Sequence, residues 1–167
     1  MFFTTYEFPK GKLLLVKSDR GLVLAHYLRT PDGIEMALKP LYRNGMDLEH
    51  KDGRFDQEKL LFDSYFQGKP ETFDSLAIDL HFGTTYQQRV WKAARSIPFG
   101  KVAAYKEIAI KLDSRGYQSV GQALNRNPLL IVVPCHRVIG ADGSIGGFGA
   151  GLKLKRYLLR LEDITVP

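Results

Sequence analysis

The segment KVAAYKEIAIKLDSRGYQSVGQALN, residues 101–125, carries the pattern that decides the fold of the second half of the chain. Apolar side chains recur at helical spacing over residues 101–112 and again over 117–126, which predicts two short helices. The DSRG between them is polar and contains a glycine, so the connecting turn is tight. This outline is typical of a helix-turn-helix, although many helical hairpins bind no nucleic acid.

More elements are expected on both sides of this pair. A helix over residues 84–96 can be capped by Thr84 or Thr85, and the apolar spacing of residues 152–162 predicts a last helix. Between them, the apolar run LLIVV, residues 129–133, predicts a buried strand.

The first half of the chain combines strand and helix patterns. Two apolar runs, residues 12–18 and 21–28, are joined by turn-forming residues and predict a hairpin. Residues 57–67 have helical spacing, 76–80 alternate like a strand, and the weak periodicity of 30–55 favours a strand and a loop. We therefore expect an α/β chain in two parts that share one core, the first with a sheet and a helix and the second mainly helical.

Charge divides the chain at the same place. Residues 1–80 carry 11 Lys and Arg against 13 Asp and Glu, a net charge of −2, whereas residues 81–167 carry 13 against 5, a net charge of +8. A basic second half indicates a polyanionic partner for that half, and a solvated basic surface is the alternative that charge leaves open.

The third helix of the second half is rich in small side chains. Ser119, Gly121 and Ala123 fall at positions outside its predicted apolar face. Small residues let a helix approach another surface closely, so they favour either a narrow DNA groove or close packing against another helix.

Composition excludes several classes of protein. One cysteine in 167 residues forbids an intrachain disulfide or a multi-cysteine zinc site, and it fits a reducing cytosol. The first residues lack the pattern of a signal peptide, and the longest apolar run, residues 129–133, is too short to cross a bilayer. We expect a cytoplasmic protein without a membrane partner.

The single cysteine, Cys135, lies in LIVVPCHRVIG, residues 130–140. A lone cysteine is usually a small buried apolar residue, but here a histidine follows it directly. The thiolate is the reactive form, and His136 could accept the thiol proton if the backbone turns here or if a water bridges the two side chains. Glu162 is the best carboxylate to orient His136. A Cys–His–Glu relay also suits a cysteine hydrolase, which the residues alone do not exclude.

Three motifs resemble one family when taken together. They are QQRVWKAARSIPFGKVAAY (residues 87–105), VGQALNRNP (120–128) and PCHRVIG (134–140), the last followed by a glycine-rich loop and a basic helix. With weaker matches in the first half, the whole chain resembles the O6-alkylguanine-DNA alkyltransferases, the methylated-DNA–protein-cysteine methyltransferases. The resemblance implies a ribonuclease H-like α/β half over residues 1–80 and a winged-helix-like half over 81–167.

The resemblance also implies a reaction. Such a protein binds the minor groove of double-stranded DNA as a monomer, without cofactor or metal, and is nucleoid-associated. It flips O6-alkylguanine, or O4-alkylthymine, out of the helix. It then transfers the alkyl group to its own Cys135 in a single turnover.

Catalytic roles carry over residue by residue. His136 would take the thiol proton through a water, and Glu162 would orient His136. Asn127 would brace the turn that holds the cysteine, Tyr105 would donate to the guanine ring, and Lys155 would hold Tyr105 and the loop. The residues implied to act in catalysis are Cys135, His136, Glu162, Asn127, Tyr105 and Lys155.

Binding roles carry over in the same way. The carbonyls of Cys135 and Val138 would accept from the guanine amine, the N–H of Gly149 would approach O6, and Leu124 and Phe148 would wall the pocket. The residues implied to contact DNA are Gln118, Ser119, Gly121, Ala123, Arg126 and Arg137.

The chain departs from the family pattern at two informative positions. Gln118 stands where relatives usually have an arginine that fills the gap left by the flipped base, and Arg115 or Arg126 could supply the missing charge. Gly149 stands where a bulkier residue is common, which leaves more room for large alkyl groups.

Two other functions compete with repair beside the hydrolase. One is a non-catalytic protein that only binds alkylated DNA, although such relatives replace the acceptor cysteine. The other is a helix-turn-helix regulator with a structural cysteine, which predicts no change in the thiol on exposure to alkylated DNA.

Overall fold

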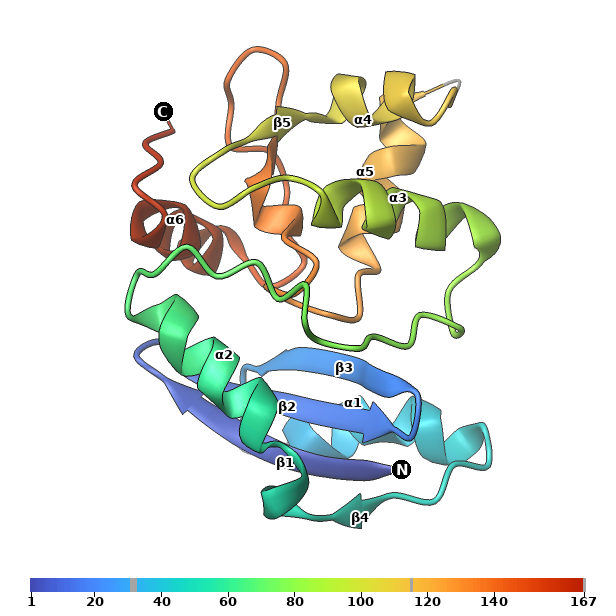
Figure 1. The fold of residues 1–167 in the computed structure, drawn as a ribbon. Coiled ribbons are helices and arrows are strands. Elements are labelled where there is room, and N and C mark those ends of the chain that lie inside the picture. The colour runs from blue at the N-terminus through green and yellow to red at the C-terminus, as the bar shows by residue number, and fades with distance from the viewer. Residues whose placement is uncertain (31–32, 115, 167) are drawn as a thin grey trace.

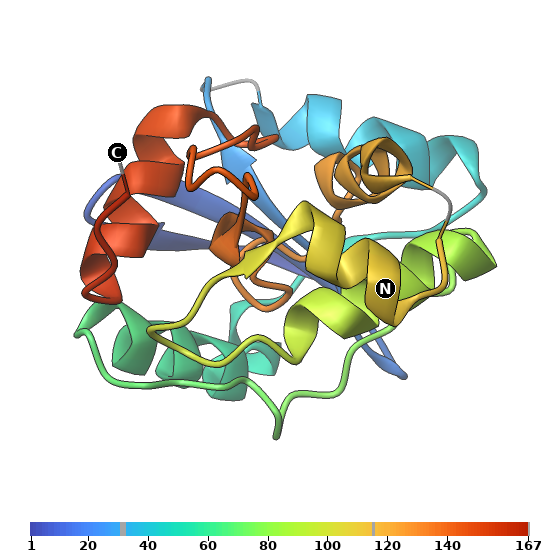
Figure 2. The ribbon, with the colours of Figure 1, turned by 90° about the horizontal axis from the view of Figure 1, so that it is seen from above.

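A computed structural model describes residues 1–30, 33–114 and 116–166 of the chain. The N-terminal half is a sheet with two helices, and the C-terminal half is mainly helical (Figure 1). Seen from above, the C-terminal half lies over the sheet (Figure 2). The two-part α/β architecture predicted from the sequence is confirmed.

The N-terminal half is built around a four-stranded sheet with the strand order β3-β2-β1-β4. Its elements are β1 (Phe2–Phe8), β2 (Gly11–Ser18), β3 (Gly21–Leu28), α1 (Gly33–Arg43), β4 (Glu49–His50), the short 3-10 turn η1 (Asp52–Arg54) and α2 (Asp56–Phe66).

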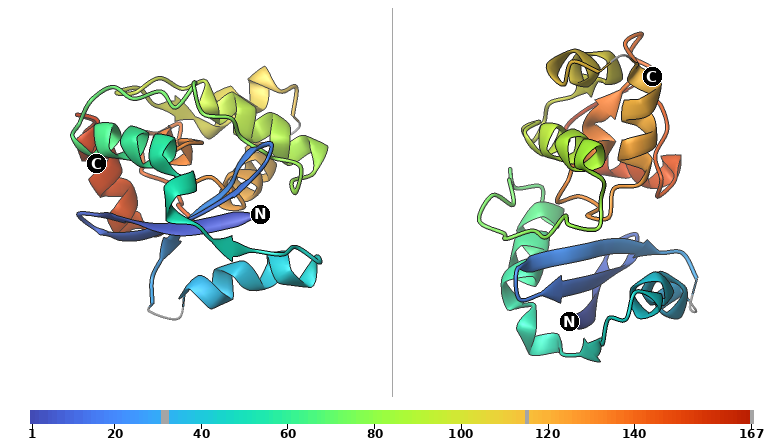
Figure 3. Two further views of the ribbon diagram at one scale, coloured as in Figure 1. Left: turned by 60° about the horizontal axis from the view of Figure 1, so that its bottom comes forward. Right: turned by 90° about the vertical axis from the view of Figure 1, so that its right-hand side faces the viewer.

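The sheet is covered on both faces, with α2 on one side and α1 on the other (Figure 3). Alternate residues of β2 follow this division: Leu13 and Leu15 belong to the main core, whereas Leu14 and Val16 pack with the residues of α1. All four side chains are fully buried. A strand covered on both faces needs an unbroken apolar run, which is why LLLV does not alternate.

Two elements of this half were not predicted. No strand is predicted over residues 2–8, yet β1 pairs with β2 along its whole length. The strand and loop expected over residues 30–55 are wrong in part, because α1 occupies most of the segment before the short β4. Pro40 lies inside α1 and obscures its pattern, and Leu38 and Leu41 supply its buried face.

The strand predicted over residues 76–80 is reduced to one bridge between Leu22 and Ile78. Leu22 donates to the Ala77 carbonyl at 2.8 Å, and Asp79 donates to Leu22 at 2.8 Å. Gly21 makes this approach feasible, since it has a φ of +140° and a Cβ there would lie 2.4 Å from the Ala77 carbonyl oxygen.

The C-terminal half is described by seven elements. They are α3 (Thr85–Arg95), β5 (Ala103–Ala104), α4 (Tyr105–Lys111), α5 (Tyr117–Asn125), the 3-10 turn η2 (Cys135–Arg137), β6 (Val138–Ile139) and α6 (Leu152–Leu161), with β5 and β6 forming one parallel pair.

The predicted helices of this half are present. Thr84 caps α3 in a capping box with Gln87, and α4 and α5 form the predicted helix pair. The indole of Trp91 on α3 donates to the Ala123 carbonyl on α5 at 2.8 Å, which fixes the pair against α3. The first of the two helices begins at Tyr105 rather than at residue 101, because β5 precedes it.

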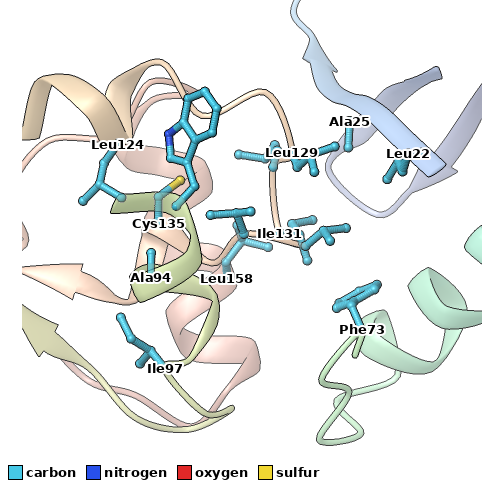
Figure 4. Close-up of a cluster of buried hydrophobic side chains, with 14 of the residues drawn as sticks. Leu22, Ala25, Phe73, Ala94, Ile97, Leu124, Leu129, Ile131, Cys135 and Leu158 are labelled. Atoms are coloured by element: carbon cyan, nitrogen blue, oxygen red, sulfur yellow. The ribbon is translucent and has the colours of Figure 1, made fainter. Parts of the chain in front are cut away.

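The strand predicted over residues 129–133 is wrong, because this segment is a buried turn. Val133 donates to the Leu129 carbonyl at 2.8 Å, and Ile131 has a φ of +72°. Leu129 of the turn forms a β-bridge with Ala25 of β3. Figure 4 shows Leu129 and Ile131 between that strand and the C-terminal half. An apolar run cannot distinguish a strand from a turn buried on every side. One core cluster therefore runs through both halves.

No helix in the described parts of the chain has the length and apolar character needed to cross a membrane.

Candidate active site around Cys135

Cys135 begins η2, directly after the buried turn, and it is 7% exposed. Asn127 holds both ends of the turn: its Nδ2 donates to the Val133 carbonyl at 2.8 Å, and its Oδ1 accepts from the Leu129 N–H at 2.9 Å. The same Nδ2 lies 3.1 Å from the sulfur of Cys135. Asn127 therefore lies where it can brace the turn, and it also donates to the sulfur itself.

Burial raises the pKa of the Cys135 thiol, against the hydrogen bond from Asn127 and the charge of Lys155, which lower it. The resting side chain is therefore a thiol at neutral pH, and it needs a proton acceptor to become a nucleophile.

His136 and Glu162 form a pair that is closed to solvent. The Nε2 of His136 lies 2.7 Å from the Oε1 of Glu162, and both side chains are 0% exposed. Burial raises the pKa of Glu162, but the hydrogen bonds from His136 and Arg137 outweigh it and lower the pKa to about 2. A carboxylate only accepts, so Nε2 carries the proton of the ring.

The other ring nitrogen of His136 is the one that can accept a proton. Burial lowers the pKa of His136 below its ordinary value, although Glu162 acts in the opposite direction. The ring is therefore neutral at pH 7 and its Nδ1 has a lone pair. Within residues 1–30, 33–114 and 116–166, Nδ1 has no hydrogen-bond partner.

The structure corrects the assignment of Arg137 to the DNA surface. Arg137 is 4% exposed, its Nε donates to Glu162 Oε2 at 2.8 Å, and its other nitrogens donate to Glu162 Oε1 at 3.0 Å and to the Ile97 carbonyl at 2.6 Å. The buried carboxylate of Glu162 needs a countercharge, and Arg137 supplies it through a bidentate ion pair.

Tyr65 is a member of this network that the sequence did not reveal. Its hydroxyl, from α2 of the N-terminal half, donates to Glu162 Oε1 at 2.7 Å and lies 3.3 Å from His136 Nε2. The signal in the sequence was a tyrosine on an apolar helix face, because a buried hydroxyl requires a partner. Its partner lies 97 residues away and cannot be identified from helical spacing.

A cavity of about 820 Å³ opens beside the sulfur. The helix pair forms one wall and the loop after β6 forms the other, with Cys135 between them. Leu124 and Phe148 line it, as predicted, and Gly149 lines it beside them. Val138 is not among its lining residues in the described chain, and the Val138 carbonyl already accepts from Lys155 at 2.6 Å.

Tyr105 and Lys155 meet at the loop wall of this cavity. The Tyr105 hydroxyl donates to the Gly147 carbonyl at 3.3 Å, and Lys155 Nζ donates to the same oxygen at 3.0 Å. Gly146 allows the contact, since a Cβ there would lie 2.9 Å from the Tyr105 ring. Lys155 thus holds the loop that Tyr105 touches.

Both side chains have shifted pKa values. Burial, and after it the nearby Cys135, raises the pKa of Tyr105, so its hydroxyl is a donor at neutral pH. Burial lowers the pKa of Lys155 to about 8, against the opposing influence of Cys135.

The predicted DNA-contact residues of α5 divide into two groups. Gln118 is exposed, and both Gln118 and Gly121 line the cavity, together with Tyr117, which was not predicted. Arg126 is exposed just after α5, whereas Arg115 lies outside the described residues.

Ser119 and Ala123 are corrections, because α5 turns them toward α3. The Ser119 hydroxyl lies 2.7 Å from the Tyr86 hydroxyl, and Ala123 is 2% exposed where Trp91 meets α5. Of the two readings of these small residues, close helix packing explains Ser119 and Ala123.

Arg29, at the end of β3, also reaches the loop and was not predicted. Its NH2 donates to the Gly149 carbonyl. A second cavity of about 360 Å³ lies here, lined by Arg29 and His26 as well as by Asn127 and Cys135. The N-terminal half therefore contacts the site at two points, Tyr65 and Arg29.

Residues 1–30, 33–114 and 116–166 contain no group of three or more His, Cys, Asp or Glu side chains placed to hold a metal ion.

Comparisons with known proteins agree along the whole chain. Residues 85–164 match the 6-O-methylguanine DNA methyltransferase, DNA binding domain, and residues 1–80 match the 6-O-methylguanine DNA methyltransferase, ribonuclease-like domain. The methylated-DNA–protein-cysteine methyltransferases of Methanosarcina mazei and Methanosarcina barkeri are 46% and 39% identical to this chain, each over 165 residues that cover 98% of both proteins.

Solved structures show the same similarity. The Mycobacterium tuberculosis OGT in complex with DNA has a TM-score of 0.83 at 35% identity, covering 97% of this chain and 92% of that one. The O6-methylguanine methyltransferase of the same organism has a TM-score of 0.81 at 36% identity, covering 96% and 92%. The chain belongs to the 6-O-methylguanine DNA methyltransferase family.

Proposed function

We propose that this chain repairs alkylated guanine in duplex DNA by direct reversal, moving the alkyl group from the guanine O6 to the sulfur of Cys135. The observation that carries the proposal is the position of that sulfur. It is held by Asn127 at the edge of a cavity of about 820 Å³ whose wall is the helix-turn-helix. A cavity of this size accommodates a base that has been rotated out of the DNA stack.

The thiol is activated by the buried pair. Nδ1 of His136 takes the proton of Cys135 through a bridging water, and Glu162, 2.7 Å from Nε2, stabilises the imidazolium that results. Asn127 then donates to the thiolate, for which a charge-assisted hydrogen bond is stronger than for the thiol.

The transfer itself is an in-line displacement. The thiolate attacks the alkyl carbon, so that a sulfur–carbon bond forms while the carbon–O6 bond breaks. The electron pair of that bond goes to guanine, where the Tyr105 hydroxyl and the Gly149 N–H meet the developing charge. The thiol proton finally neutralises the released guanine. The sulfur–carbon bond of the thioether is stable, and no step of the proposed reaction breaks it. Each molecule therefore acts once.

The helix pair supplies the DNA contacts. Gln118 and Gly121 of α5 face the cavity, and we propose that α5 enters the minor groove there, with Tyr117 and Arg126 beside it. Extruding a base costs a few kcal/mol, and less when the lesion pairs weakly.

Several finer assignments belong to the same proposal. We place the boundary between the structural half, 1–80, and the DNA-binding and catalytic half, 81–167; the two family matches, which end at residue 80 and begin at 85, support it. The ribonuclease H-like and winged-helix-like character, the monomeric state and the cytoplasmic, nucleoid-associated location stay predictions.

The test is mass spectrometry after incubation with a duplex that contains O6-methylguanine. We expect a gain of one methyl group per chain, located on Cys135, and no gain in Cys135→Ser.

The same experiment separates the competing functions. A regulator with a structural cysteine, or a non-catalytic binder, would leave the mass of the chain unchanged while binding the duplex. A cysteine hydrolase would turn over an ester or amide and gain no methyl group.

A further inference from the structure

The His136–Glu162 pair is completed by a side chain from the other half of the molecule. Tyr65 is 0% exposed, and its hydroxyl donates to Glu162 Oε1 at 2.7 Å while lying 3.3 Å from His136 Nε2. It therefore touches the two atoms that set the orientation and the tautomer of the imidazole.

Packing holds the Tyr65 ring in this position. Its neighbours are Phe73, with ring centroids 5.8 Å apart, Phe99 at 6.1 Å and edge-on, and His136 itself at 6.5 Å. Phe99 belongs to the C-terminal half, and Phe73 belongs to the segment that follows α2 in the N-terminal half. The ring is enclosed from both sides, so the hydroxyl cannot turn away from Glu162 without repacking the core.

We propose that Tyr65 is a positioning residue for alkyl transfer, and that the N-terminal half completes the active site through its hydroxyl. By holding Glu162 Oε1, Tyr65 fixes the direction of the Nε2–H bond and so keeps Nδ1 of His136 available to the thiol of Cys135. This inference rests on the proposed function, since it assigns a residue to that reaction.

The charges around the pair show what the hydroxyl contributes. Glu162 Oε1 accepts from His136, Tyr65 and Arg137, and Oε2 accepts from Arg137 and from the Gly100 N–H at 3.3 Å. Arg137 and Lys155 disfavour a proton on His136, and Glu162 favours it. Each hydrogen-bond donor to Glu162 neutralises part of the negative charge of the carboxylate. The Tyr65 hydroxyl therefore weakens the electrostatic attraction between Glu162 and a protonated His136, and this favours the neutral ring.

Other titratable groups face the same region. They are Cys135 from η2 and Tyr157 from α6, the second of which acts on Tyr65.

The experiment compares Tyr65→Phe with the wild-type chain, using O6-benzylguanine as a free base so that DNA binding does not enter. We expect alkyl transfer at neutral pH to slow by roughly tenfold, part of the contribution of a general base. The acid limb of the pH–rate profile should move to higher pH, because a less neutralised Glu162 raises the pKa of His136. NMR of labelled histidine should report the same upward shift without any reaction.

Tyr6→Phe is the matched control. Tyr6 is also a buried tyrosine of the N-terminal half whose hydroxyl donates to a carboxylate, Asp63, at 2.7 Å, but it does not touch His136 or Glu162. It should lose a comparable hydrogen bond and leave the pH–rate profile in place. Equal profiles for Tyr65→Phe and Tyr6→Phe would overturn the proposal.

A second substitution covers the case in which Tyr65→Phe does not fold. Replacing Tyr65 with 3-fluorotyrosine keeps the packing and makes the hydroxyl a stronger donor, so the His136 pKa and the acid limb should move in the opposite direction, to lower pH. No movement would contradict the positioning role. A wild-type chain that gains no methyl group from the O6-methylguanine duplex would instead refute the proposed function, while the NMR shifts would still report on Tyr65.

Discussion

At the scale of single residues, the site combines a buried thiol with groups that make its ionisation feasible. Burial alone would keep Cys135 protonated, and two neighbours oppose it: Asn127 by a hydrogen bond and Lys155 by its charge. In the proposed reaction His136 is the third, because its Nδ1, which has no hydrogen-bond partner among the described residues, accepts the proton. A thiol of this kind is protected from general oxidants because its thiolate is rare at rest. Its reactivity depends on neighbours more than on exposure.

The pH dependence of transfer tests the role of Lys155. The pKa of Lys155 is lowered to about 8, so its charge supports the thiolate below that pH and is lost above it. We expect the rate of transfer to O6-benzylguanine to show a break near pH 8, and Lys155→Met to abolish the break and slow transfer roughly tenfold at neutral pH. Mass spectrometry of reactions quenched at successive times, repeated at several pH values, measures both the break and the rate at neutral pH.

Lys153→Met provides the control, since Lys153 is an exposed lysine of the same helix. A break near pH 8 that survives in Lys155→Met would show that another group titrates there.

Acid unfolding tests Glu162. Its pKa falls from an ordinary 4.5 to about 2 in the folded chain, so its contribution to stability is complete above pH 4.5 and is lost as the pH falls toward 2. The contribution should be about 3 kcal/mol of unfolding free energy. Urea denaturation between pH 2 and 6 should show a steeper loss for the wild-type chain than for Glu162→Gln. Parallel curves would mean that other carboxylates account for acid sensitivity.

At the scale of elements, α5 presents one face to the cavity and another to α3. Because Ser119 and Ala123 face α3, the side of α5 that we propose to face DNA consists of residues that line the cavity and of residues beyond the helix end. The polar or small residues of α5 that line the cavity are Tyr117, Gln118, Gly121, Gln122 and Asn125, and none of these five carries a positive charge.

Gln118→Arg therefore should strengthen DNA binding. An added arginine at the cavity rim can contact phosphate or fill the space of an extruded base, so duplex affinity should rise and the salt dependence of log K should steepen by about one. Fluorescence anisotropy with a labelled duplex at several salt concentrations measures this. Transfer from free O6-benzylguanine is the internal control and should change little; a fall in both would place Gln118 in the chemistry.

The elements also show what a sequence can predict. Helices α2, α3, α4, α5 and α6 were predicted because each has one apolar face. The hairpin of β2 and β3 was predicted because its two apolar runs are joined by turn-forming residues. The turn at 129–133 was not, because burial on all sides removes the periodicity that separates a turn from a strand. Within the site, adjacency along the chain and motif resemblance point to Cys135 and His136, whereas Tyr65 and Arg29 depend on how two halves pack.

At the scale of the whole molecule, the two halves form one working unit. They share a core cluster, and the N-terminal half reaches the site through Tyr65 and through Arg29, which donates to the Gly149 carbonyl. Gly149 is in the loop that lines the cavity, so the hydrogen bond from Arg29 connects the sheet directly to that loop.

Arg29→Ala should therefore loosen the loop without unfolding the protein. Arg29 is exposed, so the free energy of unfolding should change by no more than about 0.5 kcal/mol. Transfer from O6-benzylguanine should slow by roughly threefold to tenfold, the range of one lost hydrogen bond. Arg43→Ala removes an exposed charge from α1 and should leave the rate unchanged. Identical rates for all three chains would show that the contact does not position the loop.

The amide of Asn127 joins the sulfur of Cys135 to the turn from Leu129 to Val133, which pairs through Leu129 with Ala25 of the other half. An alkyl group on that sulfur must occupy space beside the amide. The added atoms would therefore displace the amide and weaken the packing of the turn against the other half. A spent chain should then melt at a lower temperature than a fresh one, which calorimetry on the two forms can measure. The molecule would thus carry a lasting physical record of having been used.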